Sequence, residues 1–245
     1  MSPPSVPSVL LAPSVPSDSP CLSIIVPVFN EERTLREIVE RIRRHCPDAQ
    51  IVFVDDGSTD GSLTILHQIS STADTVLTKP NGGKGSAIRH GLPYCRGRTT
   101  IIQDADLEYD PADIPALVRE AEQRNLPAVF GSRRLRRQER QYAKWRYYIG
   151  GNLLSTITNV LFGSHLTDMM TCYKLITTPI FQSLSLSAEG FGIEPDITAH
   201  LLRRAVPIAE VPIFYRPRTR TEGKKIGWKD FFRCLGTLVR IRLGR

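Results

Sequence analysis

The sequence predicts an α/β fold with a mostly parallel, doubly wound sheet and appended C-terminal helices. Three observations lead to this prediction. From residue 22 onward, short β-rich runs alternate with stretches of helical pattern. Polar or glycine-rich residues follow each of these runs directly. The chain has 245 residues, enough to bury one full core. Alternating strands and helices form parallel strand pairs joined by crossover helices that cover both faces of a sheet.

Five strands are expected, each a short apolar run that ends in polar or turn-forming residues. The first two read Leu-Ser-Ile-Ile-Val-Pro-Val and Gln-Ile-Val-Phe-Val-Asp. The third is the shorter Thr-Val-Leu-Thr, the fourth ends in Gln-Asp, and the fifth is Ala-Val-Phe-Gly. These strands span residues 22–28, 50–55, 75–78, 99–104 and 128–131, and the helices between them lie near 32–44, 60–69, 84–94 and 111–123.

Two later helices combine apolar and basic residues, at 142–162 and 227–243. The first begins with basic and aromatic residues and continues with aliphatic ones, which favours headgroup contact followed by acyl-chain contact at a membrane. The second is typical of an interfacial helix, and equally of an amphipathic helix packed on the domain's own core. Its apolar positions at helical spacing are Trp228, Phe231, Phe232, Leu235, Leu238 and Val239.

Composition divides the chain into a tail and one domain. Residues 1–20 hold twelve prolines and serines and one charged residue, so they are expected to be disordered. Residues 21–245 are expected to form a single domain. Its five cysteines are scattered and form no C-x-x-C pair, which favours a reducing cytosol over a disulfide frame or a zinc site. No apolar stretch approaches the roughly 18 to 20 residues that cross a bilayer, so any membrane association is expected to be peripheral.

Positive charge is concentrated in two segments. The net charge is +7, to which residues 132–146 contribute +6 and residues 216–245 contribute +8, leaving −7 for the rest. Basic patches of this kind suit phosphates, anionic lipids or nucleic acid, and they also occur as solvated helix faces. Neither patch has the aromatic pattern of an RNA reader or a zinc-finger spacing, so a nucleic-acid partner is not expected.

Polar or glycine-rich residues follow all five expected strands. In a doubly wound sheet the carboxyl ends of parallel strands form the rim where ligands bind, so these residues predict one cleft. The Gly83-Lys84-Gly85 turn lacks the third glycine of the dinucleotide fingerprint, and the chain has no P-loop. Both a dinucleotide oxidoreductase and a P-loop ATPase are therefore disfavoured. The residues at the five ends are Asn30 and Glu31, then Asp55 and Asp56, residues 81–85, Asp104 and Asp106, and Ser132 and Arg133.

The fourth strand ends in closely spaced carboxylates at Asp104, Asp106 and Glu108. Carboxylates repel one another and resist dehydration, so such a cluster favours a divalent cation or a donor-rich ligand. Asp104 and Asp106 are the predicted ligands of Mg²⁺ or Mn²⁺, which neutralise charge on a departing diphosphate. Lys84, at a glycine-rich turn that opens a helix, is placed to reach the same diphosphate.

In this order the motifs resemble those of glycosyltransferase family 2. Within that family they are similar to the dolichyl-phosphate mannose and glucose synthases and the bacterial polyprenyl-phosphate sugar transferases. The resemblance extends over about residues 22–243 and is specific as an ordered set. Its matching stretches are 24–32, 54–61, 81–85, 103–108, 131–133, 167–174, 189–194 and 220–225.

The resemblance implies a GT-A-type fold and an inverting, metal-dependent transfer of a hexose from a nucleotide sugar such as UDP-glucose or GDP-mannose. It divides the domain into a nucleotide-sugar-binding half (21–133), an acceptor half (134–226) and a basic amphipathic helix (227–245). Glu108 and Gln103 match positions around the metal and diphosphate, as Asp104 and Asp106 do. The residues that match positions around the base and ribose are Pro27, Phe29, Glu31, Asp55 and Asp56.

The acceptor predicted from the resemblance is a polyprenyl phosphate. A phosphate monoester has a second pKa near about 6 and is already largely dianionic at neutral pH, so it requires cations rather than a general base. The cations that match family positions near the phosphates are Arg133, Arg146, Arg220 and Lys225. Asp168 matches the base position of relatives that act on hydroxyl groups, and here it acts either as a base or by orienting basic side chains.

The main alternative is a family 2 enzyme that transfers the sugar to a hydroxyl group of a saccharide, protein or small molecule. A donor-binding protein without catalysis is disfavoured by the intact acidic cluster. The expected location is the cytoplasmic face of a membrane. Some relatives carry a C-terminal membrane span, which makes a separate membrane-spanning subunit a further candidate partner.

Overall fold

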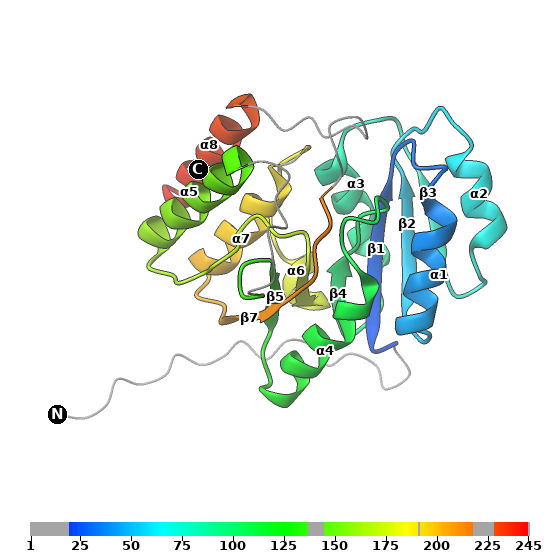
Figure 1. Cartoon of the computed structure of the whole chain (residues 1–245), viewed down its shortest axis with the longest axis horizontal. Coiled ribbons are helices and arrows are strands. Elements are labelled where there is room, and N and C mark those ends of the chain that lie inside the picture. Colours follow the sequence, from blue (N-terminus) through cyan, green and yellow to red (C-terminus); the bar gives the residue numbers. More distant parts are fainter. Residues whose placement is uncertain (1–19, 137–144, 191, 218–227, 245) are drawn as a thin grey trace.

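The structure is a computed structural model that describes residues 20–136, 145–190, 192–217 and 228–244, with side chains described from residue 152 in one late helix and from residue 230 in the other. Within these residues, seven strands form one sheet in the order β3-β2-β1-β4-β6-β5-β7 (Figure 1). The strands are β1 (Leu22–Val28), β2 (Gln50–Asp55), β3 (Thr75–Thr78), β4 (Thr99–Ile102), β5 (Ala128–Ser132), β6 (Lys174–Thr177) and β7 (Ile208–Pro212).

The sheet is mostly parallel, as predicted. Strand β1 pairs in parallel with β2 and β4, β2 with β3, and β5 with β7. Only β6, among the described strands, runs antiparallel, between β4 and β5. The five predicted strands are confirmed, although β4 ends at Ile102 rather than at 104 and β5 extends to Ser132. Neither β6 nor β7 was predicted.

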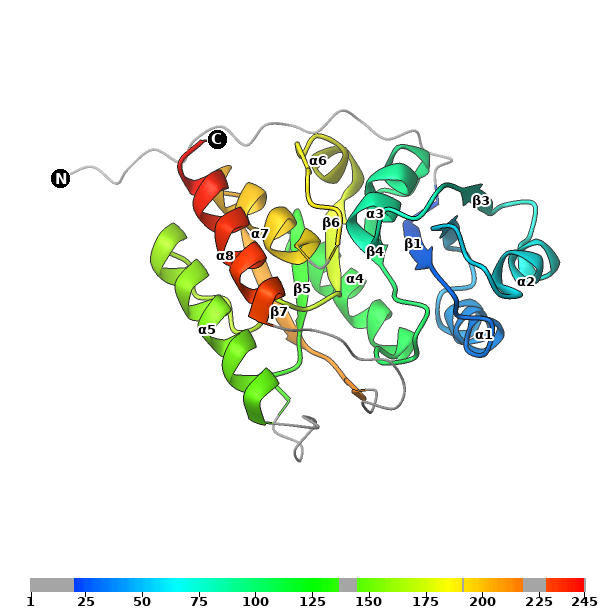
Figure 2. The ribbon, with the colours of Figure 1, turned by 90° about the horizontal axis from the view of Figure 1, so that it is seen from above.

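Helices cover both faces of the sheet (Figure 2). Helices α1, α2 and α4 lie on one face, while α3 packs on β1 and β2 from the other and is followed by α6 and α7. Apart from α5 and α8, the helical elements are α1 (Leu35–His45), α2 (Ser62–Ile69), α3 (Lys84–Gly91), η1 (Leu92–Tyr94), η2 (Pro111–Asp113), α4 (Ile114–Gln123), α6 (Thr178–Gln182) and α7 (Ile193–Arg203).

Double coverage explains why the central strands are apolar on both sides. In β1 and β2, Ile24, Ile25, Ile51 and Phe53 are fully buried, as expected of a parallel sheet between two helix layers. Helix α1 buries residues at the spacing of one helix face, and it begins three residues later than predicted because residues 32–34 form a turn.

Two helices form an outer layer on α7. Helix α5 (Trp145–Phe162) and helix α8 (Trp228–Arg242) lie side by side and both contact α7 (Figure 2). A second, smaller core joins these three helices. It includes Leu154 of α5, Ala199 of α7, Cys234 and Leu238 of α8, and Met169 of the turn before β6. Helix α8 therefore does pack on the domain's own core through one face. No helix in the described part of the chain is long and apolar enough to span a bilayer.

Candidate active site

The carboxyl ends of three neighbouring strands bring the predicted donor-site residues together. Strand β1 lies between β2 and β4, and its last residue, Val28, is in register with Asp55. The backbone N–H of Gln103 donates to Ile25 at 2.9 Å, which carries the segment after β4 along the other side of β1. Asp55 and Asp104 therefore lie on opposite sides of the end of β1. Two strand spacings separate the strands that carry them, which corresponds to about 10 Å.

Asp55 has an unsatisfied carboxylate oxygen at this rim of the sheet. The residue is 3% exposed, and its Oδ2 accepts from the backbone N–H of Ser58 at 3.2 Å. Its Oδ1 is buried with no hydrogen-bond partner among the described residues. Leaving a buried carboxylate oxygen unpaired is unfavourable, so this atom is well suited to receive a hydroxyl or N–H donor from a ligand.

Asp56 instead organises the glycine-rich turn. Its carboxylate accepts from the backbone N–H of Gly82 at 3.0 Å and of Gly83 at 2.7 Å, and from Nζ of Lys79 at 2.6 Å. The structure thus gives this carboxylate three partners within the chain. Donor contact by Asp56 stays a prediction.

The loops after β1 and β2 are tied together by hydrogen bonds. Asn30, at a positive φ of 55°, accepts from the backbone N–H of Thr59 at 2.8 Å, and the N–H of Glu31 donates to Ser62 at 2.9 Å. Pro27 is half-buried at the edge of these loops, and Phe29 is 46% exposed. An exposed aromatic ring on a fixed loop suits stacking against a nucleobase.

Lys84 links the glycine-rich turn to the acidic strand end. Its Nζ lies 2.7 Å from Asp104 Oδ1 and 2.9 Å from Glu194 Oε1, and 3.4 Å from the sulfur of Cys172. Burial lowers the pKa of Lys84, but the two carboxylates outweigh burial and hold this pKa well above its ordinary value. The lysine is therefore a permanent cation at the predicted diphosphate position.

The backbone around Lys84 is closely packed. A Cβ atom on Gly85 would lie 2.3 Å from the carbonyl oxygen of Ala188, and the N–H of Ser86 donates to Glu189 at 3.0 Å. Only glycine allows this approach of the turn to the segment before α7. Asp196 fixes that segment by accepting from the N–H groups of Ser187 and Ala188, both at 2.7 Å.

The remaining acidic residues point in different directions. Asp106 Oδ1 accepts from the backbone N–H of Glu108 at 3.1 Å, which closes a tight turn with Leu107 at a positive φ of 60°. Glu108 Oε2 accepts from the hydroxyl of Tyr215 at 2.7 Å. Within the described residues, no three His, Cys, Asp or Glu side chains are already grouped around one cation position. Asp104 and Asp106 nevertheless offer the carboxylate oxygens that Mg²⁺ and Mn²⁺ prefer, and phosphate oxygens and water would complete such a site.

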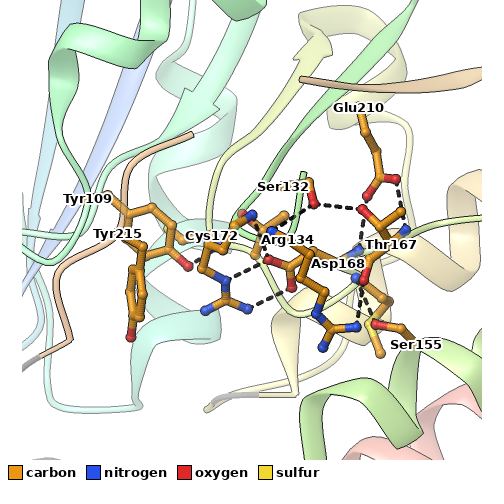
Figure 3. Close-up of polar contacts among 12 residues, drawn as sticks. Tyr109, Ser132, Arg134, Ser155, Thr167, Asp168, Cys172, Glu210 and Tyr215 are labelled. Atoms are coloured by element: carbon orange, nitrogen blue, oxygen red, sulfur yellow. Dashed lines mark hydrogen bonds and ion pairs between the residues drawn. The ribbon is translucent and has the colours of Figure 1, made fainter. Parts of the chain in front are cut away.

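Arg133 and Asp168 form a two-pronged ion pair. Nε of Arg133 lies 2.6 Å from Oδ2 of Asp168, and Nη2 lies 2.7 Å from Oδ1. The guanidinium also stacks 4.9 Å from the ring centre of Tyr215 and 6.0 Å from that of Tyr109. Figure 3 shows Tyr109 and Tyr215 on one side of Asp168, with Thr167 and Glu210 on the other.

The Asp168 carboxylate is held ionised. The residue is fully buried, which by itself raises the pKa, but the Arg133 guanidinium outweighs burial and keeps the pKa of Asp168 below its ordinary value. Burial likewise lowers the pKa of Arg133, while Asp168 holds it well above the ordinary arginine value. A carboxylate with a lowered pKa that is bound to arginine is a weak proton acceptor, so the geometry favours orientation of Arg133 over general-base catalysis.

Glu210 and Arg134, which the sequence analysis did not single out, help hold this pair in place. Glu210 of β7 accepts from the N–H groups of Thr167 at 2.8 Å and Asp168 at 3.0 Å. Arg134 donates to the carbonyl oxygen of Thr167 at 2.6 Å.

Gln103 is fully buried, accepts from the hydroxyl of Tyr173 and donates to the Asp104 carbonyl oxygen at 3.0 Å, so its side chain is engaged within the chain.

A chain of contacts connects the residues of the predicted donor side with those of the predicted acceptor side. Lys84 contacts Cys172, whose N–H donates to the hydroxyl of Tyr109 at 3.1 Å, and Tyr109 lies beside Arg133. The carboxylates and basic residues were recognisable from their sequence positions, but Tyr109, Tyr215 and Glu210 were not, because their places depend on β7 and on contacts between residues more than 40 positions apart. Arg146 lies in the first turn of α5 with its side chain outside the described part, and Arg220 and Lys225 lie outside the described residues.

This fold, with acidic strand ends facing fixed lysine and arginine side chains, defines a GT-A-type glycosyltransferase. Residues 23–184 match the family model described as glycosyl transferase family 2. The chain belongs to that family, as its motif order predicted.

Two relatives carry names from polyprenyl-phosphate chemistry. The chain is 42% identical over 110 residues to undecaprenyl-phosphate 4-deoxy-4-formamido-L-arabinose transferase of Pseudomonas fluorescens (strain Pf0-1), covering 42% of this chain and 32% of that protein. It is 31% identical over 176 residues to dodecaprenyl-phosphate galacturonate synthase of Rhizobium johnstonii, covering 69% of this chain and 51% of that protein. The chain thus spans a third to a half of the length of these curated relatives.

Solved structures support the fold. Glucosyl-3-phosphoglycerate synthase of Mycobacterium tuberculosis in complex with UDP superposes with a TM-score of 0.70 at 19% identity, over 90% of this chain and 79% of that one. The same enzyme with Mn²⁺, UDP-glucose and phosphoglyceric acid gives a TM-score of 0.69 at 20% identity, with the same coverage. At this identity the likeness defines the fold alone.

Proposed function

We propose that this domain transfers a sugar from a nucleotide sugar to a polyprenyl phosphate, with Mg²⁺ or Mn²⁺ at Asp104 and Asp106. The observation that carries the proposal is the Arg133–Asp168 pair beside the acidic strand end. It supplies a fixed cation where an anionic acceptor would lie and removes the most obvious candidate for a general base. The names of the two relatives support the same acceptor class.

The donor is proposed to bind across the ends of β1, β2 and β4. Asp55 Oδ1, buried and unpaired within the described residues, would accept a hydrogen bond from the base or ribose. Phe29, Pro27 and Glu31 border that position. Lys84 would hold the diphosphate, and its present partners, Asp104 and Glu194, keep its ammonium group aimed at the strand end.

The reaction consists of attack by an acceptor phosphate oxygen on the anomeric carbon, with departure of the nucleoside diphosphate and inversion at that carbon. A bound divalent cation supplies charge neutralisation on the leaving diphosphate. Lys84 adds a second positive charge there, and Arg133 holds the attacking phosphate through its planar fork. Arg146, Arg220 and Lys225 are proposed to help bind the acceptor phosphate.

The donor sugar is proposed to be a hexose carried on UDP or GDP. The two relatives are named for a formamido-arabinose and a galacturonate, so a test of donors must include uronic and amino-substituted sugars beside UDP-glucose and GDP-mannose.

Peripheral contact with a membrane is proposed through α8 and α5. Phe232 and Val239 of α8, and Leu243 directly after its last residue, are exposed at the spacing of one helix face, while Cys234 and Leu238 face the second core. This differs from the sequence prediction, which placed Phe232 and Leu238 on one side. On α5, Leu153 and Val160 form a similar exposed pair two turns apart. The cytoplasmic face of a membrane and a separate membrane-spanning subunit stay part of the proposal.

The test is a donor screen with extraction of the lipid product. Purified protein is incubated with each nucleotide sugar, Mg²⁺ or Mn²⁺, and a short polyprenyl phosphate, and sugar label in the chloroform phase is measured. We expect a glycolipid with at least one donor and none from the matching polyprenol, which lacks phosphate. Transfer to the polyprenol, or to a saccharide, instead favours the hydroxyl-acceptor alternative, and no product from any donor contradicts the proposal.

A pair of matched variants makes the screen specific. Asp104→Asn removes a charge from the proposed metal site and is expected to lower turnover about 100-fold or more. Asp48→Asn makes the same chemical change at an exposed position between α1 and β2, at the opposite edge of the sheet, and is expected to leave turnover unchanged. Equal effects of the two variants would contradict the assignment of Asp104.

A further inference from the structure

Lys174, the first residue of β6, is a fully buried lysine that the reaction outlined above does not use. Its Nζ donates to the carbonyl oxygen of Met169 at 2.9 Å and to that of Thr171, and it lies 4.9 Å from the ring centre of Phe130. The three N–H bonds of the ammonium group are thus directed at two carbonyl oxygens and one aromatic face. Lysine is rarely buried so completely, because dehydration of its charge is costly.

The carbonyl groups that Lys174 binds belong to a turn between the two halves of the site. The turn begins at Asp168, which forms the ion pair with Arg133, and ends at Cys172, which contacts Lys84. Met169, inside the turn, is fully buried in the second core, and its N–H donates to Ser155 of α5 at 3.1 Å. Any shift of this turn changes the distance between the predicted acceptor side and donor side.

We propose that Lys174 is a positioning residue: its ammonium group closes the turn from Asp168 to Cys172 and thereby sets the spacing between Arg133 and Lys84. Lys174 touches neither donor nor acceptor, and it acts through the turn alone. The consequence for turnover rests on the proposed function, whereas the consequence for the turn does not.

The charge state of Lys174 provides a way to test this role. Burial lowers the pKa of Lys174 to about 8. The titratable groups around it are Asp168 and Cys172 of the turn, Glu194 of α7 and Lys84 of α3, and of these only Lys84 lowers the pKa further. Near pH 8 Asp168 stays ionised, because its pKa is lowered, and Lys84 stays protonated, because its pKa is raised. In a local opening that moves the two carbonyl oxygens away while Lys174 stays dehydrated in the core, the ammonium group loses its acceptors, so loss of its proton favours that opening.

Loss of the Lys174 proton changes the stability of the whole fold in the opposite direction to the stability of the turn. The folded pKa of Lys174 lies below the value of about 10.4 for an unfolded lysine, so between these values the unfolded chain binds more protons. Through this group, folding therefore becomes more favourable as the pH rises from about 8. A turn that loosens in the same range is thus a local event and not a loss of the whole fold.

The experiment is amide hydrogen exchange of residues 169–172 between pH 6.5 and 9.5, expressed as protection factors that remove the intrinsic pH dependence. In the wild type we expect protection to fall about tenfold with an apparent pKa near 8. Lys174→Met is expected to show low protection throughout, and Lys174→Arg, which stays charged, is expected to show no fall. Gln50→Leu is the control, because Gln50 is another buried polar side chain that anchors a turn, through Tyr94 and Arg96, away from the site.

The second experiment measures the kinetics of sugar transfer with the same proteins. We expect kcat of Lys174→Met to fall about 100-fold, because small displacements of reacting groups have effects of this size. The wild type should lose kcat above pH 8, and Lys174→Arg should not. If no transfer is observed with any donor and acceptor, the proposed function fails while the exchange data still decide the role of Lys174. Protection that is independent of pH in the wild type and unchanged in Lys174→Met overturns the proposal, even if Lys174→Arg does not fold.

Discussion

At the scale of single residues, the arrangement of charges separates the two ends of the cleft. Asp55 and Asp104 are carboxylates at strand ends, while Arg133 lies beyond β5 on the other side of β6. Arg133 is only 14% exposed, so its ion pair with Asp168 is screened little by water. Because the guanidinium is held by Asp168 and by the ring of Tyr215, little ordering remains when an anionic acceptor binds.

The first prediction concerns the shape of the cation at position 133. Lysine keeps the charge but has a single point of attachment, so Arg133→Lys loses both the two-pronged contact with Asp168 and the stacking on Tyr215. We expect kcat/KM for the polyprenyl phosphate to fall about 100-fold, with donor affinity in titration calorimetry changed less than about twofold. The same substitution at the exposed Arg124, after α4, should change neither quantity. Weaker donor binding in Arg133→Lys would place this arginine on the donor side instead.

The second prediction uses the lowered pKa of Asp168. In the folded protein this pKa lies below the unfolded value of about 3.9, so the pair stabilises the fold above that value and its contribution is lost as the pH falls through the folded pKa. Asp168→Asn leaves Arg133 without its partner and is expected to cost about 3 kcal/mol at pH 7. In urea unfolding, the difference between wild type and variant should be smaller at pH 3 than at pH 7. A difference that does not depend on pH would show that Asp168 is not stabilised as an anion.

Part of the site at this scale was predictable, because Asp55, Asp104 and Arg133 lie at or just after the ends of strands. Which of these charged residues contact one another was not predictable. Arg133 and Asp168 are 35 residues apart, and Lys84 and Asp104 are 20 apart, so their contacts depend on how the chain returns to the sheet. Glu194 lies in the first turn of α7, where a carboxylate commonly complements the helix dipole, and the same carboxylate also binds Lys84 at 2.9 Å.

At the scale of elements, the glycine-rich turn before α3 is defined by contact with a distant segment. Asp56 binds the N–H groups of Gly82 and Gly83, and the carbonyl oxygens of Ala188 and Glu189 lie where a Cβ on Gly85 would be. The turn therefore requires both its hydrogen-bond acceptor from β2 and the absence of a side chain.

The third prediction follows from that contact. Gly85→Ala places a Cβ 2.3 Å from a backbone oxygen, so the turn or the 188–190 segment must shift, at a cost of about 1–3 kcal/mol. Because Lys84 is adjacent, affinity for the nucleotide sugar should fall with stability. Gly236→Ala on α8 is the matched control, since a Cβ there meets nothing within 4 Å and alanine favours helix. Thermal unfolding and calorimetry on both variants check this, and equal behaviour of the two would contradict it.

The elements also show where sequence patterns stop being informative. Strands β1 and β2 are long and apolar, and they were predicted with their observed bounds. Strand β6 is four residues that begin with a lysine, and β7 is a half-exposed edge strand that ends in proline, so neither has a strong period-two signal. Yet β6 connects β4 to β5, and without it the relation between Asp104 and Arg133 was not accessible from the sequence.

At the scale of the whole molecule, the basic residues are concentrated in two segments of the sequence, and exposed apolar side chains lie on the helices that these segments lead into or include. The two basic segments, 132–146 and 216–245, lead into or include α5 and α8, which lie side by side in Figure 2. The remainder of the chain is acidic, with a formal charge of −7. A molecule with this asymmetry is oriented by a negatively charged surface, because attraction of one side and repulsion of the other act together.

The fourth prediction is that the protein binds anionic vesicles through this outer layer. We expect sedimentation with vesicles that contain anionic lipid, little with zwitterionic ones, and a steep loss as salt is raised, because screening shortens the range of the attraction.

Apolar contact should contribute separately. Phe232→Ser with Leu243→Ser removes one exposed side chain from α8 and one from the residue that follows it, and should reduce binding at every salt concentration, by about tenfold for the pair. Tyr94→Ser, at an exposed aromatic of η1 after α3, is the control and should have no effect. If the double variant binds like the wild type while salt still abolishes binding, the surface is electrostatic alone and α8 does not enter the lipid interface.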